Sequence, residues 1–97
     1  MPFKRNILCI GAGYVGGPTM AMIAFKCPQY KVTVVDINPE RIARWNSDNL
    51  PIYEPGLENL VKKNVDAGRL SFTTDLATAV ASADAVFIAV GTPSRRG

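Results

Sequence analysis

A glycine-rich turn near the N-terminus carries the residue types that can hold a phosphate. The string GAGYVG occupies residues 11–16, directly after the apolar run Ile7 to Ile10. Gly11 lets the chain turn sharply out of a strand, and Gly13 has no side chain to obstruct a pyrophosphate. Gly16 lets the following helix pack closely on the sheet. Because the start of that helix presents unpaired N–H groups and the positive end of its dipole, we expect the turn to bind an anion.

An acid at the end of a second apolar run complements this turn. The run Lys31 to Val35 is rich in β-branched residues, which favour strands, and Asp36 follows it. Asp36 lies 20 residues after Gly16, where an acid that hydrogen-bonds a ribose is expected. A GxGxxG string alone is weak evidence, but the strand before it and the acid after it make it specific. The sequence therefore predicts a dinucleotide site that includes Gly11, Ala12, Gly13, Tyr14, Val15, Gly16 and Asp36.

Asp36 also bears on which dinucleotide is bound. Its carboxylate can accept hydrogen bonds from both ribose hydroxyls but would repel the extra phosphate of NADP, which favours NAD. Arg41 lies one helical turn into the next helix and can reach the adenosine region, which leaves NADP open; alternatively, Arg41 is a solvated side chain beside Glu40. FAD is disfavoured, because Met20 stands where a flavin site usually has a small residue, although this also departs from the NAD pattern.

A second segment, far along the chain, is expected to form the opposite wall of the site. It follows the apolar run Ala85 to Val90. Gly91 permits close approach, Thr92 offers a hydroxyl donor, and Pro93 fixes the turn. The alternative is an ordinary turn that ends a strand. The predicted second wall consists of Val90, Gly91, Thr92, Pro93 and Ser94.

Alternating strands and helices must position these residues. The order predicts an α/β fold with right-handed crossovers, a Rossmann-type doubly wound parallel sheet of strand order 3-2-1-4 that is truncated after the fourth strand. In that order, successive strands are added toward one edge of the sheet up to strand three and on the other side of strand one from strand four onward. A ligand lies in the crevice between strands one and four, at their carboxyl ends. Asn38 and Pro39 begin a helix whose apolar face carries Ile42 and Trp45. Strands are expected at 6–10, 31–36, 70–73 and 85–90, with further helices at 14–26, 56–66 and from Thr74 or Asp75 to 82.

Length and composition indicate one small domain. A chain of 97 residues suffices for a single core but buries only about 60 to 65% of its unfolded surface, which agrees with one α/β domain or a piece of one. The net charge of +3 comes from scattered basic pairs, which argues against a nucleic-acid partner. Two cysteines do not form a disulfide framework and favour a reducing, cytoplasmic location. Without histidine or clustered thiols, no metal site is expected.

A membrane interpretation of the N-terminal region has to be weighed. Residues 6–25 carry no charge and follow Lys4 and Arg5, which matches the length of a membrane span and the layout of a signal peptide. The glycines and Pro18 would interrupt a helix in lipid, and their spacing is already explained by a strand, a turn and a helix. We therefore expect no membrane partner.

Four motifs follow one another along nearly the whole chain: CIGAGYVGGPT at 9–19, VVDIN at 34–38, PIYEPGL at 51–57 and ADAVFIAVGTPS at 83–94. In this order they resemble the nucleotide-sugar dehydrogenases, the UDP-glucose and GDP-mannose dehydrogenase family. PIYEPGL is the most specific, because it is not part of the general dinucleotide fingerprint. The closest resemblance is to the members that oxidise UDP-glucose. The resemblance implies that residues 1–97 are a partial N-terminal NAD-binding domain of the Rossmann type.

The resemblance implies an enzyme that oxidises the C6 alcohol of UDP-glucose to a carboxylate. Two NAD are used, and the sugar passes through a thiohemiacetal and a thioester on a cysteine. That cysteine lies in a downstream motif to which Cys9 and Cys27 do not match, so no catalytic residue is assigned here. The 97 residues alone are expected to be inactive, and UDP-glucose is expected to bind only to the full-length enzyme. The alternatives are a standalone NAD-binding module and a structural or regulatory protein that pairs its fourth strand with another chain.

Two further expectations concern exposed segments. The run Ala85 to Val90 is typical of a strand covered on both faces, yet the sequence stops soon after it, which leaves an unpaired apolar edge. We therefore expect self-association through this edge. Glu54 is more plausible as a solvated or helix-capping acid than as a general base. Tyr53 is more plausible as an aromatic anchor of its loop than as a cofactor contact.

Overall fold

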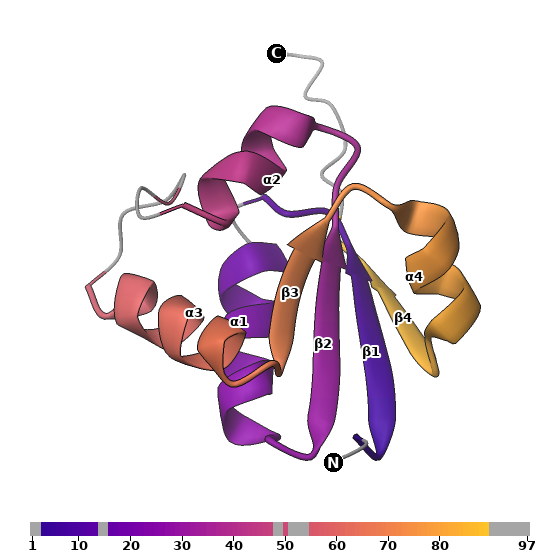
Figure 1. Ribbon diagram of the computed structural model, residues 1–97, viewed down its shortest axis with the longest axis horizontal. Coiled ribbons are helices and arrows are strands. Elements are labelled where there is room, and N and C mark those ends of the chain that lie inside the picture. Colours follow the sequence, from indigo (N-terminus) through magenta and orange to yellow (C-terminus); the bar gives the residue numbers. More distant parts are fainter. Residues whose placement is uncertain (1–2, 14–15, 48–49, 51–54, 90–97) are drawn as a thin grey trace.

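The structure, a computed structural model, describes residues 3–13, 16–47, 50 and 55–89 as a four-stranded parallel sheet flanked by helices (Figure 1). The strand order is β3-β2-β1-β4, which confirms the predicted Rossmann-type order 3-2-1-4. The strands are β1 (Arg5–Ile10), β2 (Tyr30–Val35), β3 (Leu70–Thr73) and β4 (Ala85–Ile88). The helices are α1 (Gly16–Lys26), α2 (Pro39–Trp45), α3 (Leu57–Asp66) and α4 (Leu76–Ser82).

The core lies on one face of the sheet. Alternate residues of neighbouring strands stand in one row in the parallel register, as with Ile7 beside Val32 and Val32 beside Leu70. This row packs against buried residues of α1, α2 and α3 in one hydrophobic cluster. α4 covers the opposite face, where Leu8 and Val35 are also buried. The two-faced arrangement is that of a doubly wound sheet.

Short polar signals set the helix ends. The Asn38 side chain accepts hydrogen bonds from the backbone N–H groups of Glu40 (2.9 Å) and Arg41 (3.2 Å) and so caps α2, as predicted. Of the two capping candidates for α4, Asp75 is the one that the structure uses, and it accepts from the Thr78 N–H at 3.2 Å. Gly68, just after α3, has a φ of +79°, the left-handed conformation that ends helices.

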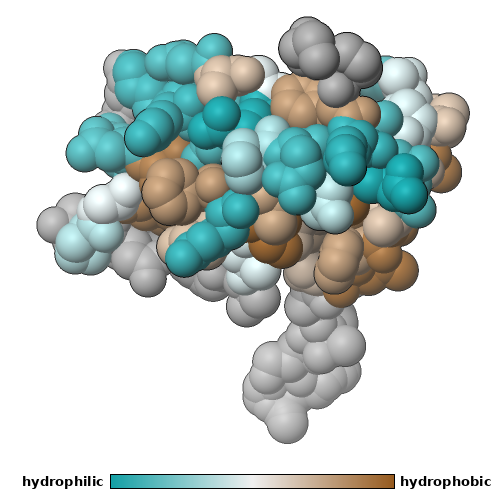
Figure 2. All heavy atoms as spheres, turned by 90° about the horizontal axis from the view of Figure 1, so that it is seen from below, coloured by the Kyte–Doolittle hydropathy of each residue, from teal (hydrophilic) through white to brown (hydrophobic). Residues whose placement is uncertain are grey.

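The fourth strand differs most from its prediction. It ends at Ile88 rather than Val90, and all four of its residues are exposed, although an apolar run of this kind is typical of a strand covered on both faces. Among the described strands β4 has one neighbour, β1, as the predicted unpaired edge requires, and no residue of α4 is buried against it. Figure 2 shows hydrophobic side chains on the right, the side where α4 and β4 lie in Figure 1.

No helix in the described part of the chain has the length and apolar character needed to span a membrane.

Candidate functional site

The reason why a glycine is needed differs among the three glycine positions of the turn. Gly11 has a φ of +116°, a conformation that side chains rarely adopt, and its N–H donates to the Val35 carbonyl at 2.7 Å. A Cβ at Gly16 would overlap the backbone carbonyl of Gly11. A Cβ at Gly13 would meet no atom of the described residues within 4 Å. The predicted sharp turn at Gly11 and close helix packing at Gly16 are therefore confirmed, and the space above Gly13 is open.

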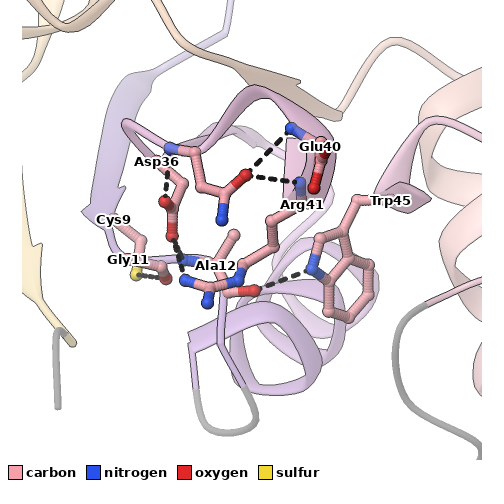
Figure 3. A network of polar contacts seen from close by, with 8 residues as sticks. Cys9, Gly11, Ala12, Asp36, Glu40, Arg41 and Trp45 are labelled. Atoms are coloured by element: carbon pink, nitrogen blue, oxygen red, sulfur yellow. Dashed lines mark hydrogen bonds and ion pairs between the residues drawn. The ribbon is translucent and has the colours of Figure 1, made fainter. Parts of the chain in front are cut away.

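Asp36 lies beside this turn and is almost fully hydrogen-bonded (Figure 3). One carboxylate oxygen, Oδ2, accepts from the Ala12 N–H at 2.9 Å and from Arg41 Nη1 at 3.0 Å. The other, Oδ1, accepts from the Asn38 N–H at 2.9 Å. Since a carboxylate offers about four acceptor positions, these three donors leave about one for a further partner.

The ionised form of Asp36 is the favoured one. Burial alone would raise the pKa of this carboxyl group. The hydrogen bonds from Ala12, Asn38 and Arg41, together with the positive charge of Arg41, outweigh burial and hold the pKa below its ordinary value. The site therefore presents a fixed negative charge next to the glycine-rich turn.

Arg41 is not the freely solvated side chain of the alternative interpretation. Its guanidinium forms an ion pair with Asp36, while its side chain remains about half-exposed. Of the three donors to Asp36, it is the one that belongs to a flexible side chain rather than to the backbone. A ligand that needs a second acceptor position on Asp36 would have to displace Arg41.

A cavity of about 290 Å³ joins the turn to Asp36 and to the end of β4. Such a volume is near the lower end of the range for ligand pockets and suits one part of a dinucleotide rather than the whole molecule. Ile37 also lines it and is 88% exposed, a residue for which the sequence pattern assigns no role. The usable signal is its position directly after the strand-ending acid. The lining residues are Ile10, Gly11, Gly13, Asp36, Ile37, Arg41 and Ala89.

Two residues outside the turn, Trp45 of α2 and Gly17 of α1, also hold it in place, and the sequence motif does not reveal either of them. The sequence pattern places Trp45 only on the apolar face of its helix. In the structure its indole Nε1 donates to the Ala12 carbonyl at 2.8 Å (Figure 3). A Cβ at Gly17 would overlap the Trp45 ring. The doubled glycine at 16 and 17 and the lone tryptophan were the available signals.

Several predicted positions lie outside the described residues. They are Tyr14 and Val15 of the turn, Val90, Gly91, Thr92, Pro93 and Ser94 of the second wall, and Tyr53 and Glu54 of the loop. On the β4 side, the structure describes the chain up to Ala89, which lines the cavity and donates its N–H to the Ile10 carbonyl at 2.8 Å.

Of the two cysteines, Cys9 and Cys27, the buried Cys9 lacks the surroundings of a nucleophile. Both are free thiols. Cys9 is buried in β1 and donates to the Gly11 carbonyl at 3.7 Å, and burial raises the pKa of its thiol. Among the residues that the structure covers, no three His, Cys, Asp or Glu side chains gather in a way that could hold a metal ion.

Comparison with known proteins gives one consistent result. The model of the NAD-binding domain of the UDP-glucose/GDP-mannose dehydrogenase family matches residues 5–97. The UDP-glucose 6-dehydrogenase of Drosophila melanogaster is 58% identical over 92 residues, which cover 93% of this chain and 19% of that protein. UDP-glucose 6-dehydrogenase 1 of Glycine max is 60% identical over 90 residues, 93% of this chain and 18% of that protein. The chain thus spans about a fifth of the relatives' length.

Solved structures agree with the sequence matches. A ternary complex of GDP-mannose dehydrogenase from Pseudomonas aeruginosa superimposes with a TM-score of 0.83 at 40% identity, over 93% of this chain and 20% of the other. A UDP-glucose dehydrogenase from the archaeon Pyrobaculum islandicum gives a TM-score of 0.82 at 38% identity, over 95% of this chain and 21% of the other.

Proposed function

The chain belongs to the UDP-glucose/GDP-mannose dehydrogenase family, and we propose that residues 1–97 are part of the N-terminal NAD-binding domain of a UDP-glucose 6-dehydrogenase. The family model identifies the cofactor as NAD. The observation that carries the proposal is the placement of Asp36 and the glycine-rich turn on one cavity, with Asp36 hydrogen-bonded to the turn itself.

The proposed cofactor contacts divide by the part of NAD that they hold. Backbone N–H groups of the turn hold the pyrophosphate, and Asp36 accepts a hydrogen bond from the adenosine ribose. Arg41 lies on the adenosine side, and the segment after β4 forms the second wall. The full set is Gly11, Ala12, Gly13, Tyr14, Val15, Gly16, Asp36, Arg41, Val90, Gly91, Thr92, Pro93 and Ser94.

Selectivity for NAD over NADP is proposed to rest on the charge of Asp36. The 2′-phosphate of NADP would lie close to a carboxylate that its hydrogen bonds keep ionised. Arg41 neutralises part of that charge, but its guanidinium is already paired with Asp36 at 3.0 Å. The net effect disfavours binding of the 2′-phosphate of NADP next to the Asp36 carboxylate.

The activity proposed for the whole enzyme is the oxidation of UDP-glucose to UDP-glucuronate. NAD, when bound, accepts a hydride, and oxidation of an alcohol to a carboxylate removes two hydrides, so two NAD are consumed. Cofactor binding is the contribution proposed for the described residues; Cys9 is a buried thiol whose raised pKa makes it a poor nucleophile. UDP-glucose is therefore proposed as a partner of the full-length enzyme.

Titration calorimetry of the folded 97-residue chain with NAD, NADP and FAD tests the proposal. We expect saturable binding of NAD, binding of NADP that is weaker by on the order of tenfold or more, and no binding of FAD. Circular dichroism on the same samples verifies that the chain is folded. A folded chain that binds none of the three, or that prefers FAD, would contradict the cofactor assignment.

A second copy of this chain is proposed as a further partner, through the edge of β4. Among the described strands β4 pairs only with β1, and Val86, Phe87 and Ile88 are large apolar residues that are exposed. An unpaired, apolar strand edge favours pairing with another chain.

The two free cysteines support a reducing, cytoplasmic location.

A further inference from the structure

Trp45 reaches the glycine-rich turn from α2 and is held on three sides. Its indole N–H donates to the Ala12 carbonyl at 2.8 Å. Its ring stacks on Phe72 of β3, with centroids 5.1 Å apart and planes inclined by 11°. The ring also fills the space beside Gly17 that a Cβ would need. With 1% of its surface exposed, Trp45 lies behind the turn (Figure 3).

The hydrogen bond to Ala12 fixes the orientation of a peptide group that matters for anion binding. The Ala12 carbonyl and the Gly13 N–H belong to the same peptide unit, which is planar and trans. In a trans peptide the C=O and N–H bonds point in opposite directions. Because Trp45 holds the carbonyl, the Gly13 N–H is directed to the side away from the indole. Gly13 lines the cavity that it shares with Asp36.

The neighbouring backbone groups are fixed as well, by different elements. The Ala12 N–H, from the preceding peptide unit, donates to Asp36 at 2.9 Å. The Gly13 carbonyl, from the following unit, accepts from the Gly17 N–H at 3.2 Å. Three successive peptide units are thus oriented before any ligand binds, the first by Asp36, the second by Trp45 and the third by α1.

We propose that Trp45 is a positioning residue for the pyrophosphate of the dinucleotide. It acts through the Ala12–Gly13 peptide and touches no ligand atom itself. The proposal rests on the proposed function, since it assumes that the turn binds a dinucleotide. Preorganised donors bind an anion more tightly than donors that must be ordered on binding. Removal of the indole N–H, with the ring kept, should therefore weaken binding of ligands that carry a pyrophosphate.

The test compares two ligands that differ by the pyrophosphate. Adenosine offers only the nucleoside, whereas ADP adds the two phosphates. In Trp45→Phe, which retains an aromatic ring but loses the donor, we expect ADP and NAD to bind roughly threefold to tenfold more weakly, with adenosine changed less than twofold. In the matched control Phe72→Leu, which removes the stacking partner but keeps the indole N–H, we expect a lower melting temperature and wild-type affinity for ADP.

The outcomes separate a positioning role from a structural one. A folded Trp45→Phe chain that binds ADP with wild-type affinity overturns the inference, as does an equal loss for ADP and adenosine. If Trp45→Phe does not fold, incorporation at position 45 of benzothienylalanine, in which sulfur replaces the N–H in a ring of the same shape, makes the same comparison. A folded wild-type chain that binds neither NAD nor ADP overturns the proposed function, and the inference with it, before any variant is measured.

Discussion

At the scale of single residues, Asp36 has two tasks. It holds the backbone through the N–H groups of Ala12 and Asn38, and it presents a negative charge to the cavity. Its partner Arg41 donates to one acceptor position of the carboxylate, and a ligand could take that position by displacing the arginine side chain without moving the backbone. Under the proposed function, selectivity among dinucleotides depends on both side chains, whereas of the two only Asp36 is hydrogen-bonded to the backbone of the turn.

Substitution of Asp36 should change selectivity as well as affinity. In Asp36→Ala we expect affinity for NAD to fall on the order of tenfold or more, since a hydrogen bond to a charged group is lost. The released Arg41 can then pair with the 2′-phosphate of NADP, so the preference for NAD should narrow. Calorimetric titration with both cofactors measures this ratio. The control is Asp36→Ala with Arg41→Ala, in which affinity for NADP should fall again; unchanged affinity for NAD in Asp36→Ala would refute the ribose assignment.

The depressed pKa of Asp36 predicts a pH dependence of stability. The folded-state pKa lies below the unfolded-state value, which is about 3.9, so at acid pH the unfolded chain binds more protons. The stabilisation is fully present above about pH 4 and is lost as the pH falls through the folded-state pKa. The difference in free energy of unfolding between the wild type and Asp36→Asn should therefore shrink as the pH falls below about 4.

Urea titrations at a series of pH values measure this difference. Trp45, the sole tryptophan and a buried one, reports unfolding through its emission. The pKa of Asp75 is also lowered, by its hydrogen bonds with Thr78. Since Asp75 is present in both proteins, its contribution cancels from the difference in free energy of unfolding. A difference that stays constant from pH 7 to pH 3 would contradict the account.

At the scale of elements, the β1 to α1 connection combines two unrelated demands on glycine. Gly16 is needed because α1 passes against the Gly11 carbonyl, which is a packing demand. A Cβ at Gly13 would meet none of the described atoms within 4 Å, so under the proposed function it is the ligand that requires glycine there. Replacing each of the two glycines by alanine distinguishes the packing requirement from the ligand requirement.

Gly13→Ala and Gly16→Ala should therefore fail in different ways. Gly16→Ala forces the backbone to shift and should lower the free energy of unfolding by about 1–3 kcal/mol. Gly13→Ala should leave stability within about 0.5 kcal/mol of the wild type and still reduce affinity for NAD, because its methyl group enters the space of the pyrophosphate. Urea denaturation and NAD titration of both variants make the comparison. Equal destabilisation of the two would show that the assignment of roles is wrong.

The sequence predicted the elements well, because their signals are local. Asn38 and Asp75 mark helix starts through contacts within a few residues, and the structure confirms both of them. The anchoring of the turn by Trp45 could not be predicted in this way, since that hydrogen bond joins residues 33 positions apart. The unpaired edge of β4 was predicted, but the exposure of all four of its residues was not, because an apolar run indicates a buried strand without showing which neighbours cover it.

At the scale of the whole molecule, burial is uneven across the sheet. The face that packs against α1, α2 and α3 carries the main cluster of buried side chains. On the side of α4 and β4, Val80, Val86, Phe87 and Ile88 are exposed (Figure 2). An apolar surface beside an unpaired strand edge favours association.

A charge on that edge should prevent association. We expect the wild-type chain to scatter light as a species larger than its 10.5 kDa monomer, increasingly so with concentration. Ile88→Lys should be monomeric, because Ile88 is 73% exposed on β4 and a lysine there opposes strand pairing without removing a buried contact. The matched control is Ile37→Lys, which changes an isoleucine that is 88% exposed but follows β2 rather than forming part of the β4 edge, and this variant should associate like the wild type. A wild-type chain that is monomeric at every concentration would rule out this partner.

The central claim, that the turn and Asp36 together form the NAD site, is tested most directly by following backbone amide resonances during titration with NAD. We predict saturable shifts that are largest at Gly11, Gly13, Asp36 and Ile37, around the cavity. Thr19, Met22 and Leu60 line a separate groove between α1 and α3, and their amides should move little. Saturable shifts centred on that groove, or no shifts in a folded chain, would contradict the account.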